Sequence, residues 1–509
     1  MPPRPSSAPV LMVLGTASSV GKSLLVTALC RVFSNEGVDV APFKSQNMSN
    51  NADVTPDGLE IGRSQSEQAA AARVLPTVEM NPILLKPSGD RTSHVILNGK
   101  PAGTRSSRDF LRSRDDLWQH AAAALDSLRE RHDLVIAEGA GAAVEPNLVA
   151  TEIVNLRVAR YAEATTLIAG DIDRGGVFGH LLGTIELMPE ADRRLICGFL
   201  INRFRGDESL LAPAIEDLER RTGISVLGVI PWIEDVTLAE EDAVALERRE
   251  PGAQSAADDA VDIAVIHLPR IANFDDFDPL RREPGVTVRY VSTAAELGDP
   301  DLLILPGTRA TIADLEALRQ RGLDAAICDR ASRGAAILGI CGGYQMLGER
   351  LLDPDGIEAA PGTEVDGLGL LPITTTFGGD KRTTRASGVV TGAAGPWQTA
   401  GGAPISGYEI HMGRSLGEAL PFLELDGHPD GAISEDGRIA GTYLHGLFAN
   451  DQLRSALLSA LGRPASVETS AAVTRDREFD RLAAVVSEHV DLDAIRAMLW
   501  PEGAPTSVS

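Results

Sequence analysis

Two successive sets of short apolar runs, each alternating with amphipathic helical patterns, constrain the fold of this 509-residue chain most strongly. The first set contains VLMVLG, DLVIAEGAG, TTLIAGD, LICGFLINRF and VLGVIPW, between residues 10 and 232. The second set contains IAVIHLP, DLLILPG, AAILGIC and RIAGTYLHG. Alternation of this kind predicts parallel strands whose two faces are covered by helices. The sequence therefore predicts an α/β protein with two doubly wound domains.

A polar segment separates the two sets. Residues 247–262, ERREPGAQSAADDAVD, carry charges, Pro, Gly and small polar side chains, which are typical of a linker. The expected segments are a flexible N-terminus at 1–9, a first domain at 10–246, a linker at 247–261, a second domain at 262–450, a C-terminal helical segment at 451–500 and a disordered tail at 501–509.

Composition limits the class of protein. The formal charge of −25 disfavours a nucleic-acid surface, since such surfaces cluster Lys and Arg. No apolar run approaches the roughly 18 residues that a membrane span needs. The start, MPPRPSSAPV, lacks a signal-peptide core, so we expect a cytoplasmic protein. The four cysteines are scattered without paired spacing, which argues against a disulfide framework and against a zinc site. The oligomeric state stays open.

A glycine-rich stretch in the first domain has the pattern of a phosphate-binding loop. Residues 12–33, MVLGTASSVGKSLLVTALCRVF, predict a strand, a loop and a helix. The loop amides and the helix N-terminus favour phosphate, Lys22 can reach the outer phosphates, and the Ser23 hydroxyl suits Mg²⁺. Five residues separate Gly15 from Gly21, one more than in the common motif. We expect ATP to be bound by Gly15, Thr16, Ser19, Gly21, Lys22 and Ser23.

Carboxylates near strand ends are candidate ligands for the Mg²⁺ that accompanies ATP. Glu138 follows an apolar strand, at the edge where open parallel sheets collect ligands. Its alternative role is that of a solvated acid. Asp53 lies in a Gly- and Asn-rich loop, and Asp171 follows another strand in GDIDRGGVFG. The metal ligands expected are Ser23, Glu138 and Asp53, although the sequence does not decide among Glu138, Asp53 and Asp171.

A polar loop that follows the predicted helix of the glycine-rich stretch is a candidate for substrate binding. The stretch FKSQNMSNNADVTPDGLEIGRSQSEQA is rich in Asn, Gln and charged residues, and such loops bind ligands more often than they build cores. Lys86, in NPILLKPSGD, is either another partner for an anion or a surface lysine. The substrate contacts expected are Lys44, Gln46, Asn47, Arg63, Lys86 and Asp171.

A cysteine in the second domain stands at a predicted strand-to-helix junction. The run RGAAILGI ends at Cys341, and GGYQMLGERLL is predicted to continue as a helix with Tyr344, Leu347 and Leu351 on one stripe. A helix N-terminus favours a thiolate, and flanking glycines relieve the crowding of a nucleophile elbow. His445, which follows another strand, is the best candidate for the base, and His411 is the second.

These residues carry a family resemblance. GICGGYQ resembles the GxCxGxQ elbow of class I glutamine amidotransferases, and LPGT resembles their oxyanion loop. The resemblance implies that Cys341 attacks glutamine and that His445 is the base. It further implies oxyanion amides from Gly307 and Gly342 and a glutamine-site position for Gln345. The acid that usually follows the histidine by two positions is replaced by Leu447, as in the branch that uses a Cys and His pair on corrinoids.

The resemblance extends over most of the chain. The first half is similar to dethiobiotin synthetase-type ATPases, with the long loop GTASSVGKS. The blocks FKSQNMSNN, EIGRSQ, NPILLKP, GDIDRGGVFG and GYEIHMG resemble the cobyric acid synthase family. This implies a P-loop-type sheet followed by an amidotransferase-like sheet. The implied reaction is ATP- and glutamine-dependent amidation of the b, d, e and g carboxylates of adenosylcobyrinic acid a,c-diamide.

Two alternatives stay open at this point. The related a,c-diamide synthases perform the same chemistry on other carboxylates of the corrinoid. The second alternative is a P-loop ATPase with a degenerate, noncatalytic amidotransferase-like domain. Such a protein has both motifs but does not couple them in one reaction. The corrinoid, ATP and glutamine are the small-molecule partners that the favoured interpretation requires.

Overall fold

The computed structural model describes residues 7–89, 92–106, 109, 114–148, 151–234, 260–463 and 470–501. The chain forms two compact units. Unit 1 comprises Met1–Ser49, Glu60–Ala239 and Arg475–Ser509, and unit 2 comprises Asn50–Leu59 and Glu240–Thr474. Most of the expected linker, the first residues of the chain and nearly all of the expected tail lie outside the described residues.

Unit 1 is built on a parallel sheet, as the sequence predicts. Its strands lie in the order β12-β11-β10-β1-β9-β2, and every neighbouring pair is parallel. Their bounds are β1 Val10–Gly15, β2 Val40–Phe43, β9 Leu134–Glu138, β10 Thr165–Asp171, β11 Ile196–Phe204 and β12 Val226–Pro231. The apolar runs quoted above for the first set form β1, β9, β10, β11 and β12.

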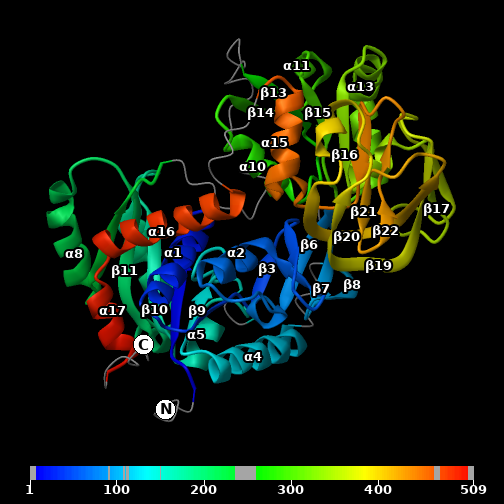
Figure 1. The fold of residues 1–509 in the computed structure, drawn as a ribbon. Helices are drawn as coiled ribbons and strands as arrows, with labels where there is room; N and C mark the ends of the chain where they lie inside the picture. The colour runs from blue at the N-terminus through cyan, green and yellow to red at the C-terminus, as the bar shows by residue number, and fades with distance from the viewer. Residues whose placement is uncertain are drawn as a thin grey trace. The chain divides into compact units, whose positions relative to one another are not determined.

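Helices cover both faces of this sheet. Successive residues of β1 enter different cores, because side chains alternate across a strand: Leu11 packs with α1, α16 and α17, whereas Met12 packs with α4, α5, α6 and α8. Figure 1 shows α1 and α16 together beside the sheet. The bounds are α1 Lys22–Asn35, α2 Arg63–Ala71, α4 Arg114–Arg131, α5 Leu156–Ala162, α6 Val177–Leu187, α7 Glu190–Arg193, α8 Ala212–Thr222, α16 Ala471–His489 and α17 Leu492–Leu499.

A small sheet extends unit 1. Its strands lie in the order β3-β6-β7-β8, and one face covers an apolar cluster that includes Leu85 and Leu117. The remaining elements of unit 1 are β3 Gln46–Met48, β5 Glu60–Gly62, β6 Ile83–Gly89, β7 Thr92–Leu97, β8 Lys100–Ser106 and the 3-10 turns η1 Val78–Met80 and η2 Glu208–Leu211.

Unit 2 contains a second doubly wound sheet. Its order is β14-β13-β15-β16-β24-β23, parallel except for the pairing of β23 with β24. The bounds are β13 Val261–Ile266, β14 Val286–Val291, β15 Leu302–Leu305, β16 Ala336–Ile340, β23 Ala432–Ile433 and β24 Ile439–Thr442. The four runs quoted for the second set form β13, β15, β16 and β24, which confirms the predicted α/β class.

Unit 2 also contains a second, largely antiparallel sheet, none of whose strands was predicted from the sequence. Its order is β18-β17-β19-β21-β22, and β20 also pairs with β19. Its strands are β17 Arg350–Asp353, β18 Thr363–Asp366, β19 Ile373–Val390, β20 Pro404–Gly417, β21 Leu423–Leu425 and β22 His428–Asp430. Unit 2 also contains β4 Ala52–Val54, α10 Asp278–Arg281, α11 Ala294–Leu297, α12 Thr311–Gln320, α13 Leu323–Ser332, α14 Gly342–Leu347, α15 Asp451–Ala460, η3 Phe274–Phe277, η4 Gly395–Ala400 and η5 Leu447–Ala449.

Three features differ from the sequence expectations. The helix after Cys341 ends at Leu347, because the backbone becomes extended at Gly348, so Leu351 lies in β17 rather than on a helical stripe. The expected C-terminal segment is divided: α15 belongs to unit 2, whereas nearly all of α16 and all of α17 belong to unit 1. Finally, Asn50–Leu59, which lies inside the expected first domain, belongs to unit 2.

Candidate functional site

The phosphate-binding loop of unit 1 lies between β1 and α1. Gly21 precedes α1 with φ 98°, in the left-handed region that favours glycine. A side chain at Gly21 would also overlap Asn202, since an added Cβ would come within 2.2 Å of the Asn202 Nδ2. Ser19 has φ 60°. The loop therefore turns tightly just before α1, as expected of a backbone that cradles phosphate.

Lys22 bends back over this loop. Its Nζ donates hydrogen bonds to the carbonyl oxygens of Ala17, at 2.9 Å, and of Gly141, at 2.8 Å. Asn155 holds the strand-end turn that carries Gly141, because its Nδ2 donates to the oxygens of Ala140 and Ala142. The ammonium group is thus fixed across the mouth of the loop, where its charge can interact with phosphate.

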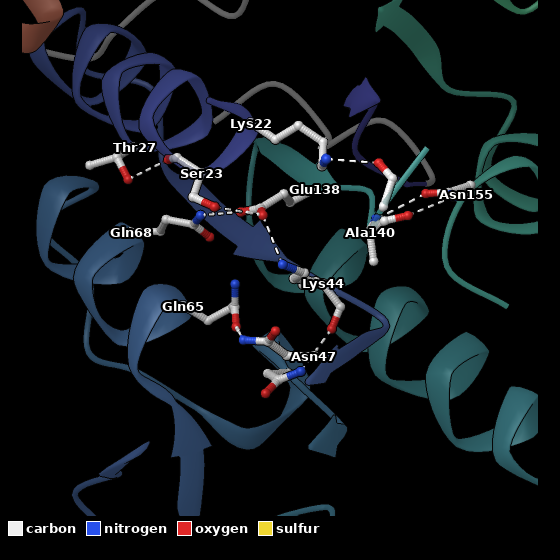
Figure 2. Close-up of polar contacts among 12 residues, drawn as sticks. Lys22, Ser23, Thr27, Lys44, Asn47, Gln65, Gln68, Glu138, Ala140 and Asn155 are labelled. Atoms are coloured by element: carbon white, nitrogen blue, oxygen red, sulfur yellow. Dashed lines mark hydrogen bonds and ion pairs between the residues drawn. The ribbon is translucent and has the colours of Figure 1, made fainter. Parts of the chain in front are cut away.

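Glu138 is the centre of the polar cluster in Figure 2. Its Oε1 accepts hydrogen bonds from the Ser23 Oγ, at 2.9 Å, and from the Lys44 Nζ, at 2.8 Å. The Gln68 Nε2 donates to its Oε2 at 2.5 Å. Both Glu138 and Lys44 are buried. The structure therefore brings together Ser23, Glu138 and Lys44 from the sequence predictions and adds Gln68, which those predictions missed.

The carboxylate of Glu138 is held in its charged form. Burial by itself raises the pKa of Glu138, but the Lys44 ammonium and the surrounding hydrogen-bond donors outweigh that effect, so the pKa lies below its ordinary value. A charged carboxylate beside the Ser23 hydroxyl offers the oxygen donors that Mg²⁺ prefers. This donor set fits a magnesium ion that accompanies a bound nucleotide.

The other polar residues predicted for unit 1 are engaged in ion pairs or hydrogen bonds. Lys86 pairs with Glu60, and both side chains are buried. Asp171 pairs with Arg203 at 2.8 Å. Arg63 forms an ion pair with Glu67 at 3.2 Å, and the Asn47 Nδ2 donates a hydrogen bond to the Gln65 Oε1 at 3.0 Å. Gln46 lies in β3. Buried carboxylates therefore balance the charges of Lys44 and Lys86.

Asp53 belongs to a different unit from Ser23 and Glu138. It lies in β4 of unit 2, where its Oδ1 is 3.5 Å from the Arg385 Nη2. Unit 1 therefore contains two of the three predicted metal ligands, and Asp53 is not among them. No group of three or more His, Cys, Asp or Glu side chains that could hold a metal occurs among the described residues.

Cys341 of unit 2 lies at the junction predicted for a nucleophile elbow. It follows β16 and precedes α14 with φ 50° and ψ −109°, a strained conformation for a residue with a side chain. Glycines surround it because there is no room for Cβ atoms: a Cβ at Gly343 would lie 2.0 Å from the Leu305 oxygen, and one at Gly339 would lie 2.6 Å from the Tyr344 Cα. A strained residue at a sharp strand-to-helix turn is the arrangement of a nucleophile elbow.

His445 has an acidic partner that the sequence analysis missed. Its Nδ1 lies 2.7 Å from the Oδ2 of Asp276, and the other carboxylate oxygen accepts from the Gly446 N–H at 2.8 Å. Both side chains are buried. The acid absent at Leu447 is thus supplied from η3, far away in the sequence. The prediction of an unassisted Cys and His pair is wrong for this geometry.

Asp276 and Cys341 together favour the protonated imidazole. Burial by itself lowers the pKa of His445, but the Asp276 charge, its hydrogen bond and the interaction with Cys341 outweigh that effect and raise the pKa to about 10. An imidazolium beside a cysteine stabilises the thiolate. The arrangement can therefore present a nucleophilic sulfur together with a proton donor.

Strand β20 lines the other side of this pair. Its Ile410 oxygen accepts a hydrogen bond from the Cys341 Sγ at 3.6 Å. The Tyr408 ring stacks on the His445 imidazole with centroids 5.3 Å apart. His411, the second candidate base, instead stacks on Tyr443 with centroids 3.8 Å apart. Its Nδ1 lies 2.8 Å from the Gly413 oxygen. The described contacts thus place His445 in the network of Cys341.

The residues expected around a glutamine carboxamide also gather here. An added Cβ at Gly307 would lie 2.9 Å from the His445 Cε1, so this loop passes directly beside the imidazole. A Cβ at Gly342 would lie 2.6 Å from the Thr308 Cγ2, which keeps the two candidate oxyanion segments in contact. Gln345 is buried and held at both ends, by the Thr311 hydroxyl at 2.9 Å and the Tyr443 hydroxyl at 3.2 Å.

Two family models match the chain, one in each half. Residues 11–245 match the CobQ/CobB/MinD/ParA nucleotide binding domain, and residues 262–453 match the CobB/CobQ-like glutamine amidotransferase domain. These ranges contain the phosphate-binding loop and the cysteine elbow, respectively. Within the described residues, no helix has the length and apolarity required to cross a membrane.

Curated relatives resemble the chain over nearly its full length. The cobyric acid synthase of Chloroflexus aggregans is 53% identical over 493 residues, which cover 95% of this chain and 98% of that protein. That of Roseiflexus castenholzii is 52% identical, covering 96% and 99%. That of Dehalococcoides mccartyi strain CBDB1 is 48% identical, covering 97% and 99%. With this identity and coverage, and with a nucleotide-binding and an amidotransferase domain in one polypeptide, the chain belongs to the cobyric acid synthase family.

Proposed function

We propose that this protein uses ATP and glutamine to amidate the b, d, e and g carboxylates of adenosylcobyrinic acid a,c-diamide, giving adenosylcobyric acid. The observation that carries the proposal is the presence of two complementary sites in one chain. The Cys341 elbow with the His445–Asp276 pair is suited to release ammonia from glutamine. The phosphate-binding loop with Lys22 is suited to activate a carboxylate that ammonia can attack.

In the amidotransferase half, residues 262–450, the Cys341 thiolate attacks the carboxamide carbon of glutamine. The amides of Gly307 and Gly342 stabilise the oxyanion, and the His445 imidazolium donates its proton to the departing ammonia. A thioester remains on Cys341. His445 then accepts a proton from water, which attacks the thioester and releases glutamate. Asp276 keeps the imidazole oriented through both steps.

In the synthetase half, residues 10–246, the loop from Gly15 to Ser23 binds the phosphates of ATP, and Lys22 offsets their charge. Transfer of the γ-phosphoryl group to a corrinoid carboxylate makes an acyl phosphate, because a free carboxylate is a poor electrophile. Ammonia then forms the amide and phosphate leaves. Ser23 and Glu138 would hold Mg²⁺, which supplies further charge stabilisation for the phosphates when it is bound. We place this chemistry in the cytoplasm, where ATP and glutamine are available.

We assign the candidate corrinoid contacts to polar residues. In unit 1 the candidates are Gln46, Asn47, Arg63 and Asp171, together with Lys44 and Lys86, whose charges are shared with buried carboxylates.

The experiment that tests this function supplies the purified protein with ATP, glutamine and one of two corrinoids. Mass spectrometry then locates the new amides. With the a,c-diamide as substrate, amides at the b, d, e and g positions support the proposal. Amidation of cobyrinic acid at the a and c positions alone would identify the other synthase of the pathway. Glutamine hydrolysis without any corrinoid product would leave an amidotransferase with another acceptor.

A further inference from the structure

A short stretch of the N-terminal half of the sequence is built into unit 2. Asn50–Leu59 follows Met1–Ser49 of unit 1 and precedes Glu60–Ala239, also of unit 1, yet its own contacts group it with the amidotransferase half. The family models place residue 50 in the nucleotide-binding match, which extends over residues 11–245. The amidotransferase unit is therefore completed by residues from outside its own sequence range.

Asn51 makes the most specific contact of this stretch. Its Oδ1 accepts a hydrogen bond from the backbone N–H of Asn273 at 2.7 Å. In return, the backbone N–H of Ala52 donates to the Oδ1 of Asn273 at 2.9 Å. All three residues are buried. A buried, reciprocal pair of this kind fixes both partners, since either group left unpaired would lose its hydrogen bond without gaining one to water.

Asn273 has a backbone conformation that needs support. Its φ is 51° and its ψ is 44°, in the left-handed region, directly before η3. Its carbonyl oxygen accepts from the Asp276 N–H at 3.1 Å, which closes the turn that carries the Asp276 carboxylate. The conformation of Asn273 therefore sets the position of Asp276 and, through it, the orientation of the His445 imidazole.

The same loop also reaches the candidate oxyanion segment. Ala272, the neighbour of Asn273, donates its N–H to the Gly307 oxygen at 2.9 Å. Ile271 and Thr308 form an isolated β-bridge. One loop, residues 271–276, thus touches both the acid of the His445 pair and the Gly307 segment. Asn51 contacts it between those two points.

The rest of the inserted stretch is tied to the second sheet of unit 2. The Arg385 Nε, from β19, donates to the Val54 oxygen at 2.7 Å, and its guanidinium lies 3.5 Å from the Asp53 carboxylate. These contacts tie β4 to β19. The stretch is therefore held by β19 at Asp53 and Val54 and by the 271–276 loop at Asn51.

We propose that Asn51 is a positioning residue for glutamine hydrolysis, acting through Asn273 on both Asp276 and Gly307. The inference rests on the proposed function for its glutaminase half and deepens it: a residue carried by the ATP-binding half of the sequence completes the amidotransferase site. The chain that leads into Asn51 contains Lys44, which pairs with Glu138 in the nucleotide site. Glutamine hydrolysis therefore depends on a segment that is continuous in sequence with the nucleotide site.

The test compares full-length variants in which single contacts are removed. Asn51→Leu keeps the approximate size of the side chain but removes the acceptor. Asn273→Gly removes the Oδ1 acceptor while tolerating the left-handed backbone. Asp57→Asn is the matched control, because Asp57 is an exposed position of the same stretch whose Oδ1 accepts from the Thr55 hydroxyl, an acceptor that asparagine retains.

Glutamine hydrolysis is measured as glutamate release across a range of pH, without a corrinoid. We expect kcat/KM for glutamine to fall on the order of 10- to 100-fold in Asn51→Leu and Asn273→Gly, since small displacements of a catalytic group have effects of that size. The groups that face the His445 imidazole are Asp276, Cys341 and Tyr408. As Asp276 moves away, the basic limb of the profile should shift to lower pH. Asp57→Asn should match the wild type.

Amidation with saturating ammonium separates this role from a general role in folding. Asn51→Leu and Asn273→Gly should retain the wild-type rate with ammonium, which bypasses Cys341. A wild-type rate and pH profile of glutamine hydrolysis in both variants would overturn the inference, and so would an equal loss with both nitrogen sources. If wild-type protein hydrolyses glutamine but amidates no corrinoid, the proposed function fails, while the comparison of glutamate release still decides the role of Asn51.

Discussion

The Asp276 carboxylate lies 2.7 Å from Nδ1 of the His445 imidazole, although the two residues are 169 positions apart in the sequence. The acid that partners the histidine comes from η3, which follows β13, rather than from the loop that carries the histidine. Burial lowers the pKa of His445, but this contact and the interaction with Cys341 outweigh that effect and raise the pKa to about 10. At neutral pH the imidazole is therefore protonated beside Cys341.

Replacing Asp276 by asparagine tests that contact. The Asp276 charge raises the pKa of His445, so its removal must lower that pKa. The basic limb of kcat/KM for glutamine, where the imidazolium loses its proton, should move to lower pH, and the rate at neutral pH should fall by a factor on the order of 10² to 10⁴. Glutamate release across the pH range measures both effects. An unchanged basic limb would show that Asp276 does not govern this proton.

Cys341→Ala should separate the two halves of the reaction. Without the sulfur no thioester can form, so glutamine-dependent amidation should fall to background. High concentrations of ammonium should restore it, because the synthetase half keeps its own residues. Product formation with each nitrogen source is the measurement. Loss of both activities would mean that Cys341 is needed for the fold rather than for ammonia release.

Lys22→Ala should have the opposite pattern. The Lys22 ammonium is held across the phosphate-binding loop by the Ala17 and Gly141 oxygens, where its charge meets the phosphates. Its loss should remove amidation from glutamine and from ammonium alike, while Cys341-dependent hydrolysis of glutamine persists. Lys100→Ala, at an exposed position in β8, serves as a control for loss of a positive charge. Retained ATP-dependent amidation in Lys22→Ala would contradict the assignment of the loop.

Removing only the carboxylate of the buried Lys44–Glu138 pair should lower the free energy of unfolding more than removing both charges. Glu138→Gln leaves the Lys44 ammonium buried without its carboxylate, and breaking a buried pair in this way typically costs about 3–5 kcal/mol. The double variant Glu138→Gln/Lys44→Met removes both charges and should recover most of that loss. Urea unfolding of the two variants and the wild type measures the difference. Equal destabilisation by the single and double variants would mean that the unpaired Lys44 charge is not the cause of the loss.

Much of the fold was predictable because its strands are buried on both faces. Runs such as those of β1 and β16 are apolar along their whole length, and Gly-rich loops mark their carboxyl ends. The phosphate-binding loop and the elbow at Cys341 are local: a left-handed glycine at Gly21 and crowded glycines around the cysteine leave a signature within a few residues. Local patterns of this kind can be recognised from the sequence alone.

The missed parts depend on contacts between distant residues. Asp276 lies in the stretch IANFDDFD, where three acids look alike, and only the fold shows which one meets His445. Leu351 was assigned to a helix because its spacing from Leu347 is helical, but Gly348 ends that helix and β17 pairs with β19. Nothing in the composition of Asn50–Leu59 indicates that it belongs to unit 2, since the interaction that holds Asn51 is with a residue more than 200 positions away.

One measurement tests the central claim most directly. Wild-type protein is incubated with ATP, the a,c-diamide substrate and glutamine labelled with ¹⁵N at its amide, and the corrinoid product is analysed by mass spectrometry. The account predicts label at the b, d, e and g amides, no product when ATP is omitted, and no labelled product from Cys341→Ala. Consumption of glutamine and ATP without labelled nitrogen in the corrinoid would contradict it.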